Sequence, residues 1–524
     1  MIVRKAPGAG NGPELAVERG GGKVGRQISL INGFSATIRL SQAIALSRLP
    51  MVFSVTPNGS VKLLGTGVDG HDVKKDVGSM YAVREVTGAG EYWNNGFTGK
   101  GVDIAIIDSG VVPVLGLDDP GKIVYGPDLS FQSQAENVRN LDTFGHGTHM
   151  AGIIAGRDPG KYQISKGVEE HYLGIAPSAR IVSVKVADEY GNTDVSQVLA
   201  AIDWVVQHRR SNGLNIRVLN LSFGTDGTQD YILDPLTYAV EVAWRSGIFV
   251  VVAGGNAGYG SPKLNNPAYD PLIMAVGAAD GKGTYGTDDD VVASFSSTGD
   301  AARPPDLVAP GKSIVSLRSP GSFLDASFAS ARVGDTPRFF KGSGTSQAAA
   351  VVSGAAALVL EQRPSITPDQ LKGLLKRTAY KLPKADVTAQ GAGMIDLKRA
   401  RDVATPAFTQ TFAPATGLGS LELARGTHHL LEGSVELNGE TDIFGKPFVT
   451  VAWAPLAAAG AAWSGGDWNG STWSGSTWSG STWSGSTWSG STWSGSTWSG
   501  STWSGSTWCA THWSASSWLG VTWL

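Results

Sequence analysis

Three residues of the types that form a serine-hydrolase triad occur along the chain in the order Asp108, His146 and Ser346. A serine hydroxyl is a poor nucleophile until a neighbouring imidazole removes its proton, and a carboxylate can hold that imidazole in the required tautomer. Each residue lies in a segment suited to its part, namely IAIIDSGVVP, DTFGHGTHMAGIIAG and FFKGSGTSQAAAVVSGAAALVL. The residue types therefore predict acyl-transfer chemistry, provided that the fold brings the three segments together.

Asp108 ends the apolar segment VDIAIID and precedes Ser109-Gly110, so its carboxylate should emerge at the carboxyl edge of a strand. There it can accept the Nδ1 proton of a histidine. Taken alone, Asp108 is equally compatible with a residue that caps the next helix or turn. We expect Asp103, on the same strand, to be a solvated charge at the edge of the sheet.

His146 lies between Gly145 and Gly147, which allow the backbone to pack closely, and the following MAGIIAG segment predicts a helix. A lone histidine is more often a hydrogen-bonding residue of the core, but GHGTH after an IDSG strand favours a catalytic base. We interpret His149 as structural. A zinc site is disfavoured because the HExxH arrangement is absent.

Ser346 opens the long apolar segment SQAAAVVSGAAALVLEQ, which predicts a buried helix. The amides of a helix N-terminus point towards any oxyanion that forms there, and a serine that caps the helix is compatible with this role. A fourth segment, VVVAGGNAG, supplies an amide side chain at Asn256. An asparagine after a strand is also a common turn residue.

The elements that must position these residues follow from the hydrophobic pattern between residues 78 and 405. The runs VDIAIID, RIVSVKVA, IRVLNLSFG, IFVVVAGG and LIMAVGAA have the continuous apolar character of parallel strands buried on both faces. VSQVLAAIDWVVQHRR and LTYAVEVAWRSG have apolar residues at helical spacing, and Thr367 with Gln370 forms a capping-box pattern before a further helix. The sequence thus predicts a doubly wound α/β domain, in which ligands bind at the carboxyl ends of the strands.

The four segments, in this order on an α/β pattern, resemble those of the subtilase (subtilisin-like serine protease) family, in which Asp, His and Ser follow one another along the chain. The resemblance extends from the N-terminus to about residue 400. It implies a subtilisin-like, mostly parallel sheet and a serine endopeptidase that hydrolyses peptide bonds through an acyl-enzyme intermediate. Subtilases usually read GTSMAAP at the nucleophile, whereas this chain has Gln347 and Ala350, a change that we expect to affect helix geometry rather than chemistry.

The resemblance also implies the remaining parts of the site. Asn256 would donate a hydrogen bond to the oxyanion together with the backbone N–H of Ser346. Two short stretches would hold a polypeptide substrate through its main chain as an added strand; they comprise Ser222, Phe223, Gly224, Ala253, Gly254 and Gly255. No cofactor would be needed for the chemistry. Structural calcium is frequent in the family, and Asp118, Asp119 and the acidic run at 288–290 are candidate ligands, although surface acids are usually just solvated.

Residues 1–65 form a small α+β pattern that resembles the inhibitory propeptide of subtilases, including its strand-like segment INGFSA. Such a propeptide would act as an intramolecular inhibitor in a self-processing zymogen, and residues 66–77, polar and rich in glycine, would be the processing linker. The alternative is an N-terminal packing domain. The catalytic domain would span 78–405, and a bridging region at 406–460 has weak strand signals in SLELA and FVTVAW.

The remaining residues, 461–524, form a low-complexity repeat tail with the unit WSGST and Trp at every fifth position from Trp463 to Trp523. A period of five forms no stripe on a helix and places successive Trp side chains on opposite faces of a strand. Short strands turned at Ser-Gly, or a β-solenoid, would reconcile the two. Such a β-rich tail would offer Trp rows for contact with cell-wall polysaccharide; the alternative is a spacer or adhesive extension without a specific ligand.

The composition excludes several other classes of function. With 524 residues, a net charge of −3 and 17% charged residues, the chain has no sign of the basic face that binds nucleic acid. The single cysteine, Cys509, excludes an intramolecular disulfide framework and leaves a thiol that could pair between molecules. No signal peptide is visible and no apolar run is long enough to span a bilayer. A propeptide and a surface-type tail nevertheless favour a secreted or cell-surface protein.

Two rival functions remain for comparison. A surface binding or adhesion protein could use the protease fold as a scaffold, and missing catalytic residues would favour it, but none of the triad types is missing. An esterase of the α/β-hydrolase type would need a GxSxG elbow and the order Ser, Asp, His. Here the GTSQA segment follows the histidine, so the sequence disfavours that class.

Overall fold

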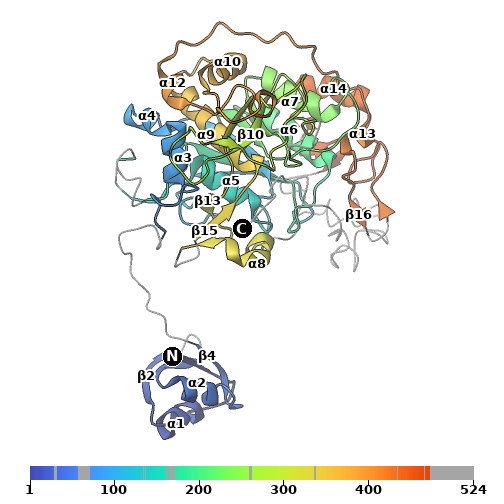
Figure 1. The fold of residues 1–524 in the computed structure, drawn as a ribbon. Helices are drawn as coiled ribbons and strands as arrows, with labels where there is room; N and C mark the ends of the chain where they lie inside the picture. Colours follow the sequence, from blue (N-terminus) through green and yellow to red (C-terminus); the bar gives the residue numbers. More distant parts are fainter. Residues whose placement is uncertain are drawn as a thin grey trace. The chain divides into compact units, whose positions relative to one another are not determined.

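The structure is a computed structural model that describes residues 1–28, 32–56, 71–133, 135, 137–160, 163–164, 171–258, 263–334, 338–432, 435–464 and 466–472. The chain forms two compact units, Met1–Gly65 and Thr66–Leu524 (Figure 1). No helix within the described ranges is long and apolar enough to cross a membrane.

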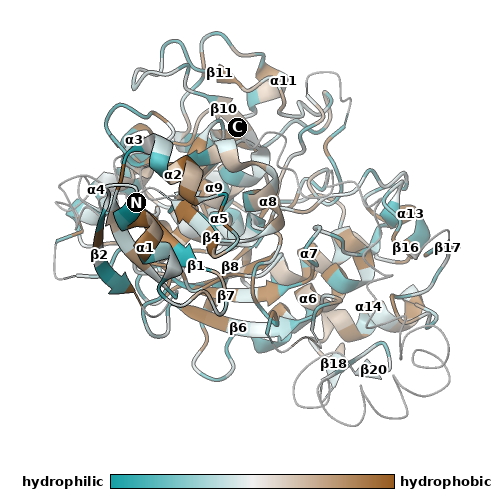
Figure 2. Cartoon of the chain, turned by 90° about the horizontal axis from the view of Figure 1, so that it is seen from below, coloured by the Kyte–Doolittle hydropathy of each residue, from teal (hydrophilic) through white to brown (hydrophobic). Residues whose placement is uncertain are grey.

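The N-terminal unit is a four-stranded antiparallel sheet in the order β2-β3-β1-β4, with two helices. Its elements are β1 (Ile2–Lys5), α1 (Gly12–Arg19), β2 (Lys23–Ile28), β3 (Gly33–Thr37), α2 (Leu40–Leu46) and β4 (Val52–Thr56). This βαββαβ order is the ferredoxin-like arrangement. Val3, Phe34 and Val17 lie at the centre of its small apolar core. In Figure 2, α1 and α2 carry both hydrophobic and hydrophilic residues, as expected of helices with one buried face.

The second unit is built on a large sheet with eight strands among the described residues, in the order β11-β10-β9-β8-β5-β7-β6, with β12 beside β10. The strands are β5 (Asp103–Asp108), β6 (Ile123–Asp128), β7 (Arg180–Lys185), β8 (Ile216–Leu221), β9 (Phe249–Ala253), β10 (Met274–Asp280), β11 (Val291–Val292) and β12 (Leu307–Pro310). All neighbours pair in parallel except β10 and β11. The central strands are buried throughout, because helices cover both faces.

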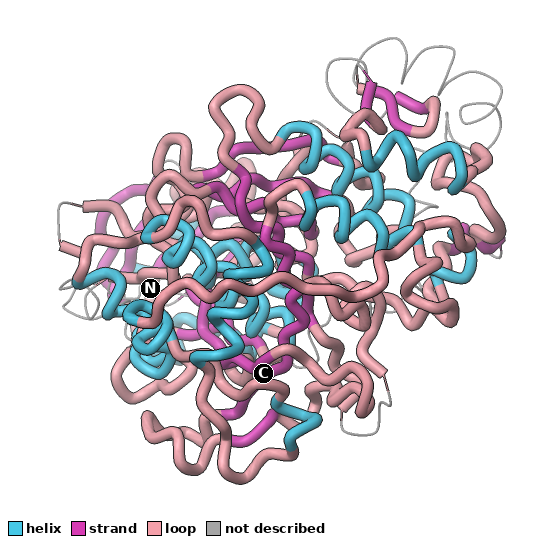
Figure 3. The backbone as a smooth tube through the Cα atoms, turned by 90° about the horizontal axis from the view of Figure 1, so that it is seen from above, coloured by secondary structure: helices cyan, strands magenta, loops and turns pink. Residues whose placement is uncertain are grey.

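Helices on both faces of the sheet confirm the predicted doubly wound α/β fold (Figure 3). On one face, α5 (His146–Ala155) packs against α9 (Thr345–Gln362), and α9 also contacts β8, β9 and β10. On the other, α6 (Val195–His208) packs against α7 (Pro235–Arg245). Smaller helices surround them: α3 (Met80–Thr87), α4 (Ala89–Asn94), α10 (Pro368–Thr378), α11 (Val387–Gln390) and α12 (Leu397–Asp402).

Two further features lie outside the large sheet. The capping box predicted for Thr367 and Gln370 is confirmed at the start of α10, where each side chain accepts from the other residue's backbone N–H. A second, antiparallel sheet, β13-β15-β14, lies beside α5 and carries α8. Its elements are β13 (Ile314–Leu317), α8 (Phe323–Ser327), β14 (Arg332–Val333) and β15 (Phe339–Gly342).

Residues 406–472, which we name the C-terminal strap, pack on α6 and α7. The strap contains α13 (Leu421–Arg425), β16 (Leu431–Glu432), β17 (Val435–Glu436), α14 (Thr450–Ala458), β18 (Trp463–Ser464), β19 (Asp467–Trp468) and β20 (Ser471–Thr472). The strand predictions for SLELA (420–424) and FVTVAW (448–453) were wrong. Residues 421–424 lie in α13, and residues 450–453 lie in the first turn of α14. For α13 the reason is local, because the Ser420 hydroxyl caps it by accepting from the backbone N–H of Leu423.

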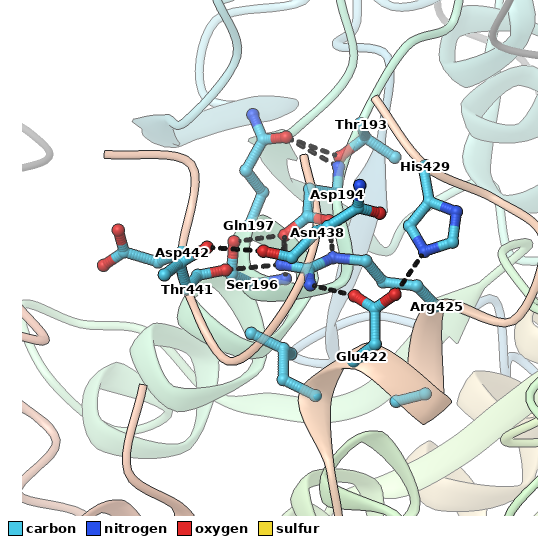
Figure 4. A network of polar contacts seen from close by, with 12 residues as sticks. Thr193, Asp194, Ser196, Gln197, Glu422, Arg425, His429, Asn438, Thr441 and Asp442 are labelled. Atoms are coloured by element: carbon cyan, nitrogen blue, oxygen red, sulfur yellow. Dashed lines mark hydrogen bonds and ion pairs between the residues drawn. The ribbon is translucent and has the colours of Figure 1, made fainter. Parts of the chain in front are cut away.

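Arg425 of α13 anchors the strap to the start of α6 (Figure 4). Its Nε lies 2.7 Å from Oδ2 of Asp194, which caps α6, and both side chains are fully buried. Glu422 and the backbone carbonyl groups of Gly439 and Thr441 accept further guanidinium hydrogen bonds, and Asp194 Oδ1 accepts one from Nη2 at 3.4 Å. Burial alone would raise the pKa of Asp194, but the Arg425 charge outweighs it and lowers that pKa below its usual value.

A second anchor joins the strap to the middle of α6 at Asp203. The indole Nε1 atoms of Trp453 and Trp468 donate to its Oδ2 at 2.8 and 2.7 Å, while that of Trp463 donates to the backbone oxygen of Ala200 at 2.7 Å. Burial raises the pKa of Asp203 to about 7, against the opposing effect of the two indole hydrogen bonds. The strap is therefore held at two carboxylates with chemically different partners.

Candidate active site

Asp108 and His146 are in direct contact at the carboxyl edge of the large sheet. Asp108 is the last residue of β5, and His146 is the first residue of α5. The His146 Nδ1 lies 2.8 Å and 2.9 Å from the two carboxylate oxygens, and both side chains are 1% exposed. Because a carboxylate can only accept, Nδ1 carries the proton of this contact, and Nε2 is the basic nitrogen of the neutral ring.

Ser109 and Asp142 form a second layer around this pair. The backbone N–H of Ser109 donates to Asp108, and its hydroxyl donates to Asp142 at 2.8 Å. Asp142 also accepts from the backbone N–H groups of Gly145 (2.6 Å) and Thr148 (2.7 Å), which begin α5. Burial raises the pKa of Asp142, although these hydrogen bonds oppose the rise. Sequence reasoning missed Asp142; the available signal was an aspartate just before a helix start, a common capping position.

The glycines on either side of His146 have the predicted packing role. Gly145 has φ of 112°, a conformation that favours glycine, at the turn into α5. A side chain at Gly147 would collide with the backbone oxygen of Gly110. The two glycines thus let the start of α5 lie directly against the chain that follows Asp108.

Ser346 lies in the first turn of α9, fully buried, and its Oγ makes no hydrogen bond to any of the described residues. The helices α5 and α9 pack against each other and both begin at the carboxyl edge of the sheet. Ile154 and Gly354 stand equally far along these helices from His146 and Ser346, and a Cβ on Gly354 would lie 3.2 Å from the Ile154 oxygen. The two helices therefore lie directly against each other eight residues beyond His146 and Ser346.

Asn256 joins the end of β9 to the start of α9. Its Oδ1 accepts from the backbone N–H of Thr345 at 2.9 Å and from the Thr345 hydroxyl at 3.1 Å. The backbone N–H of Gly255 in turn donates to Thr345 Oγ1 at 3.2 Å. Since the amide oxygen is used to fix the side chain, the amide nitrogen is the group that can donate beside Ser346.

The two predicted substrate-binding stretches both lie at this edge. Ser222–Gly224 directly follow β8, and Ala253–Gly255 end and follow β9, the neighbouring parallel strand. The backbone of Gly254 pairs with Val276 and Asn265, and the Gly255 carbonyl accepts from Ser297 at 2.8 Å. The second stretch is therefore held firmly by internal hydrogen bonds.

A cavity of about 600 Å³ adjoins these stretches. Its lining residues come from the chain after Gly224 and from the loop after Asn256, and they include Thr225, Asp226, Asp230, Lys263, Asn265 and Tyr269. A Cβ on Gly224 would lie 2.9 Å from the Asn265 Cβ, so the glycine allows the two walls to meet. Leu264 and Tyr231 also line the cavity, so its lining combines charged and apolar groups.

The structure places two further titratable residues outside the site. His149 is buried with Nε2 3.1 Å from the Phe340 oxygen, and burial lowers its pKa to about 3. The prediction of a solvated Asp103 was wrong. Asp103 is buried and makes two hydrogen bonds of 2.6 Å with Arg180, its register partner on β7, because β5 lies inside the sheet.

Among the residues that the structure describes, no group of three or more His, Cys, Asp or Glu side chains could hold a metal ion. Asp118 accepts from the backbone N–H of Gly116, and Asp289 accepts from the Thr284 hydroxyl. The acidic residues considered for calcium are thus not assembled into such a group, and structural calcium stays a prediction.

Known proteins resemble this chain over the segment that carries these residues. The sequence model of the subtilase family matches residues 99–396. The chain is 38% identical to serine protease AprX of Bacillus subtilis over 322 residues, which cover 60% of this chain and 69% of AprX. It is 34% identical to subtilisin Savinase of Lederbergia lenta over 311 residues, 59% of this chain and 93% of Savinase.

A further relative is the minor extracellular protease Epr of Bacillus subtilis, 33% identical over 325 residues. That match covers 62% of this chain but only 42% of Epr. The matched family segment contains Asp108, His146, Asn256 and Ser346, and it accounts for more than half of the chain. The chain therefore belongs to the subtilase family and is a subtilisin-like serine endopeptidase.

Proposed function

We propose that Asp108, His146 and Ser346 are the catalytic triad of this endopeptidase. Asp108 holds the His146 ring in place, His146 removes the Ser346 proton as its Oγ attacks the peptide carbonyl, and the same proton then goes to the leaving amine. Water hydrolyses the resulting acyl-enzyme by the same route. The observation that carries this proposal is the double contact of His146 Nδ1 with Asp108.

Asn256 is proposed as an oxyanion donor, together with the backbone N–H of Ser346. The support is its position between β9 and the start of α9, with Oδ1 held by Thr345. Loss of one such donor costs about 2.7–4 kcal/mol of transition-state stabilisation. Asn256→Ala should therefore lower kcat by about 10²–10³-fold with little change in KM.

The polypeptide substrate is proposed to bind as an added strand along Ser222–Gly224, since this stretch lies at the edge that carries the triad. Ala253–Gly255 would line the site beside it, because the backbone groups of Gly254 and Gly255 are already hydrogen-bonded within the protein. One substrate side chain would enter the adjoining cavity. Recognition through the main chain gives broad specificity.

A fluorophosphonate probe tests the triad directly, because it reacts only with an activated serine. Mass mapping should locate the adduct on Ser346, and Ser346→Ala should abolish both labelling and peptide hydrolysis. Asp108→Asn should slow labelling strongly while the protein stays folded. A wild-type protein that hydrolyses peptides without an adduct at Ser346 would contradict the proposed mechanism. A folded protein without any hydrolysis would instead favour the alternative of a binding or adhesion scaffold.

We further propose that residues 1–65 are an inhibitory propeptide and that the chain is a self-processing zymogen. The support is the compact, separate unit with its own core, followed by the polar linker at 66–77. Purified wild-type protein should shorten with time through a cut in that linker, whereas Ser346→Ala should remain at full length. Added unit 1–65 should inhibit the processed enzyme. Equal processing of both proteins would contradict self-maturation.

Secretion is proposed because the related Epr is named as an extracellular protease; detection of activity in the culture medium is the test. Contact with cell-wall polysaccharide through the Trp tail is a proposal for residues 473–524, which lie outside the described ranges. The first two repeat residues do not serve it, because Trp463 and Trp468 are buried against the strap and α6.

A further inference from the structure

The segment that carries α8 is tied to the chain immediately before His146. The backbone N–H groups of Phe323 and Leu324 donate to the carbonyl oxygens of Thr143 and Phe144, each at 2.9 Å. The Ser319 hydroxyl donates to the backbone carbonyl oxygen of Asp142 at 2.6 Å. Figure 1 shows α8 next to β15, at the lower edge of the larger unit. The position of α8 is thus fixed relative to the catalytic histidine.

Ion pairs hold α8 to the chain on either side of it. Asp325 of α8 accepts from Arg318 at 2.7 Å and from Arg332 at 2.6 Å, and it also accepts from the backbone N–H of Gly321 at 2.9 Å. The carboxylate is 4% exposed, so these contacts are screened little by solvent. A short helix that would otherwise fray is held by both of its flanking chains.

The aromatic rings of Phe144, Phe323 and Tyr190 form a cluster at the start of α8. The Phe323 ring stacks on the buried Phe144 ring at 6.1 Å with an angle of 14°, and Tyr190 meets Phe323 edge-on at 5.5 Å and 74°. Tyr190 belongs to the loop between β7 and α6, which leaves the same carboxyl edge of the sheet. A Cβ on Gly191 would lie 3.0 Å from the Phe144 ring, so the loop also packs closely on the stack.

Two of these rings remain accessible. Tyr190 is 44% exposed and Phe323 is 39% exposed, whereas Phe144 beneath them is buried. Rigid, partly exposed aromatic rings are the groups that most often anchor a bound partner, because little conformational entropy is lost when they are covered. We name the exposed pair Phe323 and Tyr190 the aromatic rim.

We propose that the aromatic rim is a specificity-determining subsite that binds an apolar side chain of the polypeptide substrate close to the cleaved bond. The occupant follows from continuity with the site: Phe144, the base of the rim, stands two residues before His146 in sequence. An extended peptide that presents its carbonyl to Ser346 passes this histidine, and alternate side chains of the peptide point to the same side. The inference rests on the proposed triad and adds a selection that main-chain recognition alone does not provide.

The test compares cleavage profiles on a library of peptides randomised around the cleaved bond. Wild-type enzyme should prefer large apolar residues at one position that flanks the bond. Phe323→Ala and Tyr190→Ala should each lower kcat/KM about tenfold for peptides with a large apolar residue there, a size typical of lost apolar pocket contacts. Both should leave kcat/KM unchanged for peptides with alanine at that position.

Phe408→Ala is the matched control, since Phe408 is also 39% exposed but lies against Gly373 of α10. Its cleavage profile should equal that of the wild type. The rate of fluorophosphonate labelling at Ser346 should be the same in all four proteins, which separates a lost subsite from a damaged triad. Tyr190→Ala, a loop substitution, keeps the test valid if the α8 variant does not fold.

An unchanged profile in the Tyr190 and Phe323 variants would overturn the subsite. An equal loss for all peptides, with labelling intact, would overturn it too, because the rim would then support the fold rather than choose the substrate. Absence of labelling in the wild type would contradict the triad itself, and the two failures are therefore distinguishable.

Discussion

The catalytic edge and the C-terminal strap both bury carboxylates, but each carboxylate has a different kind of partner. Asp108 contacts the imidazole of His146, a group that can gain and lose a proton. Asp194 contacts the guanidinium of Arg425, which stays charged. Asp203 accepts from two neutral indole groups and has no cation among the hydrogen-bond partners that its side chain shows.

These partners decide what each carboxylate does. Beside a titratable ring, a buried carboxylate supports chemistry because it stabilises the protonated ring as it forms. Beside a permanent cation it joins two parts of the fold, and removal of either member leaves a buried charge. Beside neutral donors, as at Asp203, a buried carboxylate can accept a proton near neutral pH. The contact between α6 and the strap should then depend on pH. Substitutions that change one partner at a time should separate these three behaviours.

The largest effect is expected at Asp108. Asp108→Asn keeps the shape but presents the wrong hydrogen-bond pattern to His146 Nδ1, so kcat should fall by about 10⁴-fold, the size typical of this change in such triads. The thermal midpoint should change little. Hydrolysis of a chromogenic peptide and a melting curve check both parts. A fall of less than tenfold would mean that Asp108 does not orient the ring.

Arg425 should show the opposite behaviour, with lost stability and intact chemistry. Arg425→Met leaves Asp194 buried without its cation and should lower the free energy of unfolding by about 3–5 kcal/mol. Urea unfolding in a Ser346→Ala background measures this without self-digestion. Lys75→Ala, which breaks the exposed pair with Asp72, should leave the unfolding midpoint in place. Equal midpoints for the two variants would contradict a structural role for the Asp194–Arg425 pair.

The catalytic edge was far more predictable from the sequence than the strap. Asp108, His146 and Ser346 stand next to strand ends or helix starts, and a parallel sheet brings such positions to one edge whatever the loops do. Asp142 and Asp103 could not be interpreted in this way. Their partners, Gly145 and Arg180, become visible only when the helix start and the strand order are known.

The strap was less predictable because its elements are short and depend on contacts with the larger unit. A strand pattern of four or five residues also fits one helical turn, and the cap at Ser420 decided α13. The Trp period posed a related problem. The chain turns at Asn469 and Gly470, both with positive φ, and Trp463 pairs with Trp468 across β18 and β19. Trp463 and Trp468 therefore share a face of this small sheet, and the structure of the further repeats stays a prediction.

Asp203 should make the stability of the strap depend on pH. Its folded-state pKa of about 7 lies above the value of about 4 in an unfolded chain, so the folded state binds this proton more tightly. The contribution is present below pH 4 and is lost as pH rises through 7. In the Ser346→Ala background, Asp203→Asn should therefore be more stable than its parent at pH 8, and the difference should shrink towards pH 4. A difference in melting temperature that does not vary with pH would contradict this assignment.

The smallest effect is expected from removal of a single indole N–H at the same carboxylate. Trp468→Phe keeps a ring to stack on Phe448 but removes one of the two donors to Asp203. A hydrogen bond to a charged group contributes about 1.5–3 kcal/mol and one to a neutral group about 0.5–1.5 kcal/mol. The loss of stability should therefore be larger at pH 8, where Asp203 is ionised, than at pH 5. Trp463→Phe is the matched control, because its indole donates to the backbone oxygen of Ala200, which does not titrate. Its cost should be the same at both pH values, and a cost that changes with pH equally in both variants would show that the sensitivity lies elsewhere than in Asp203.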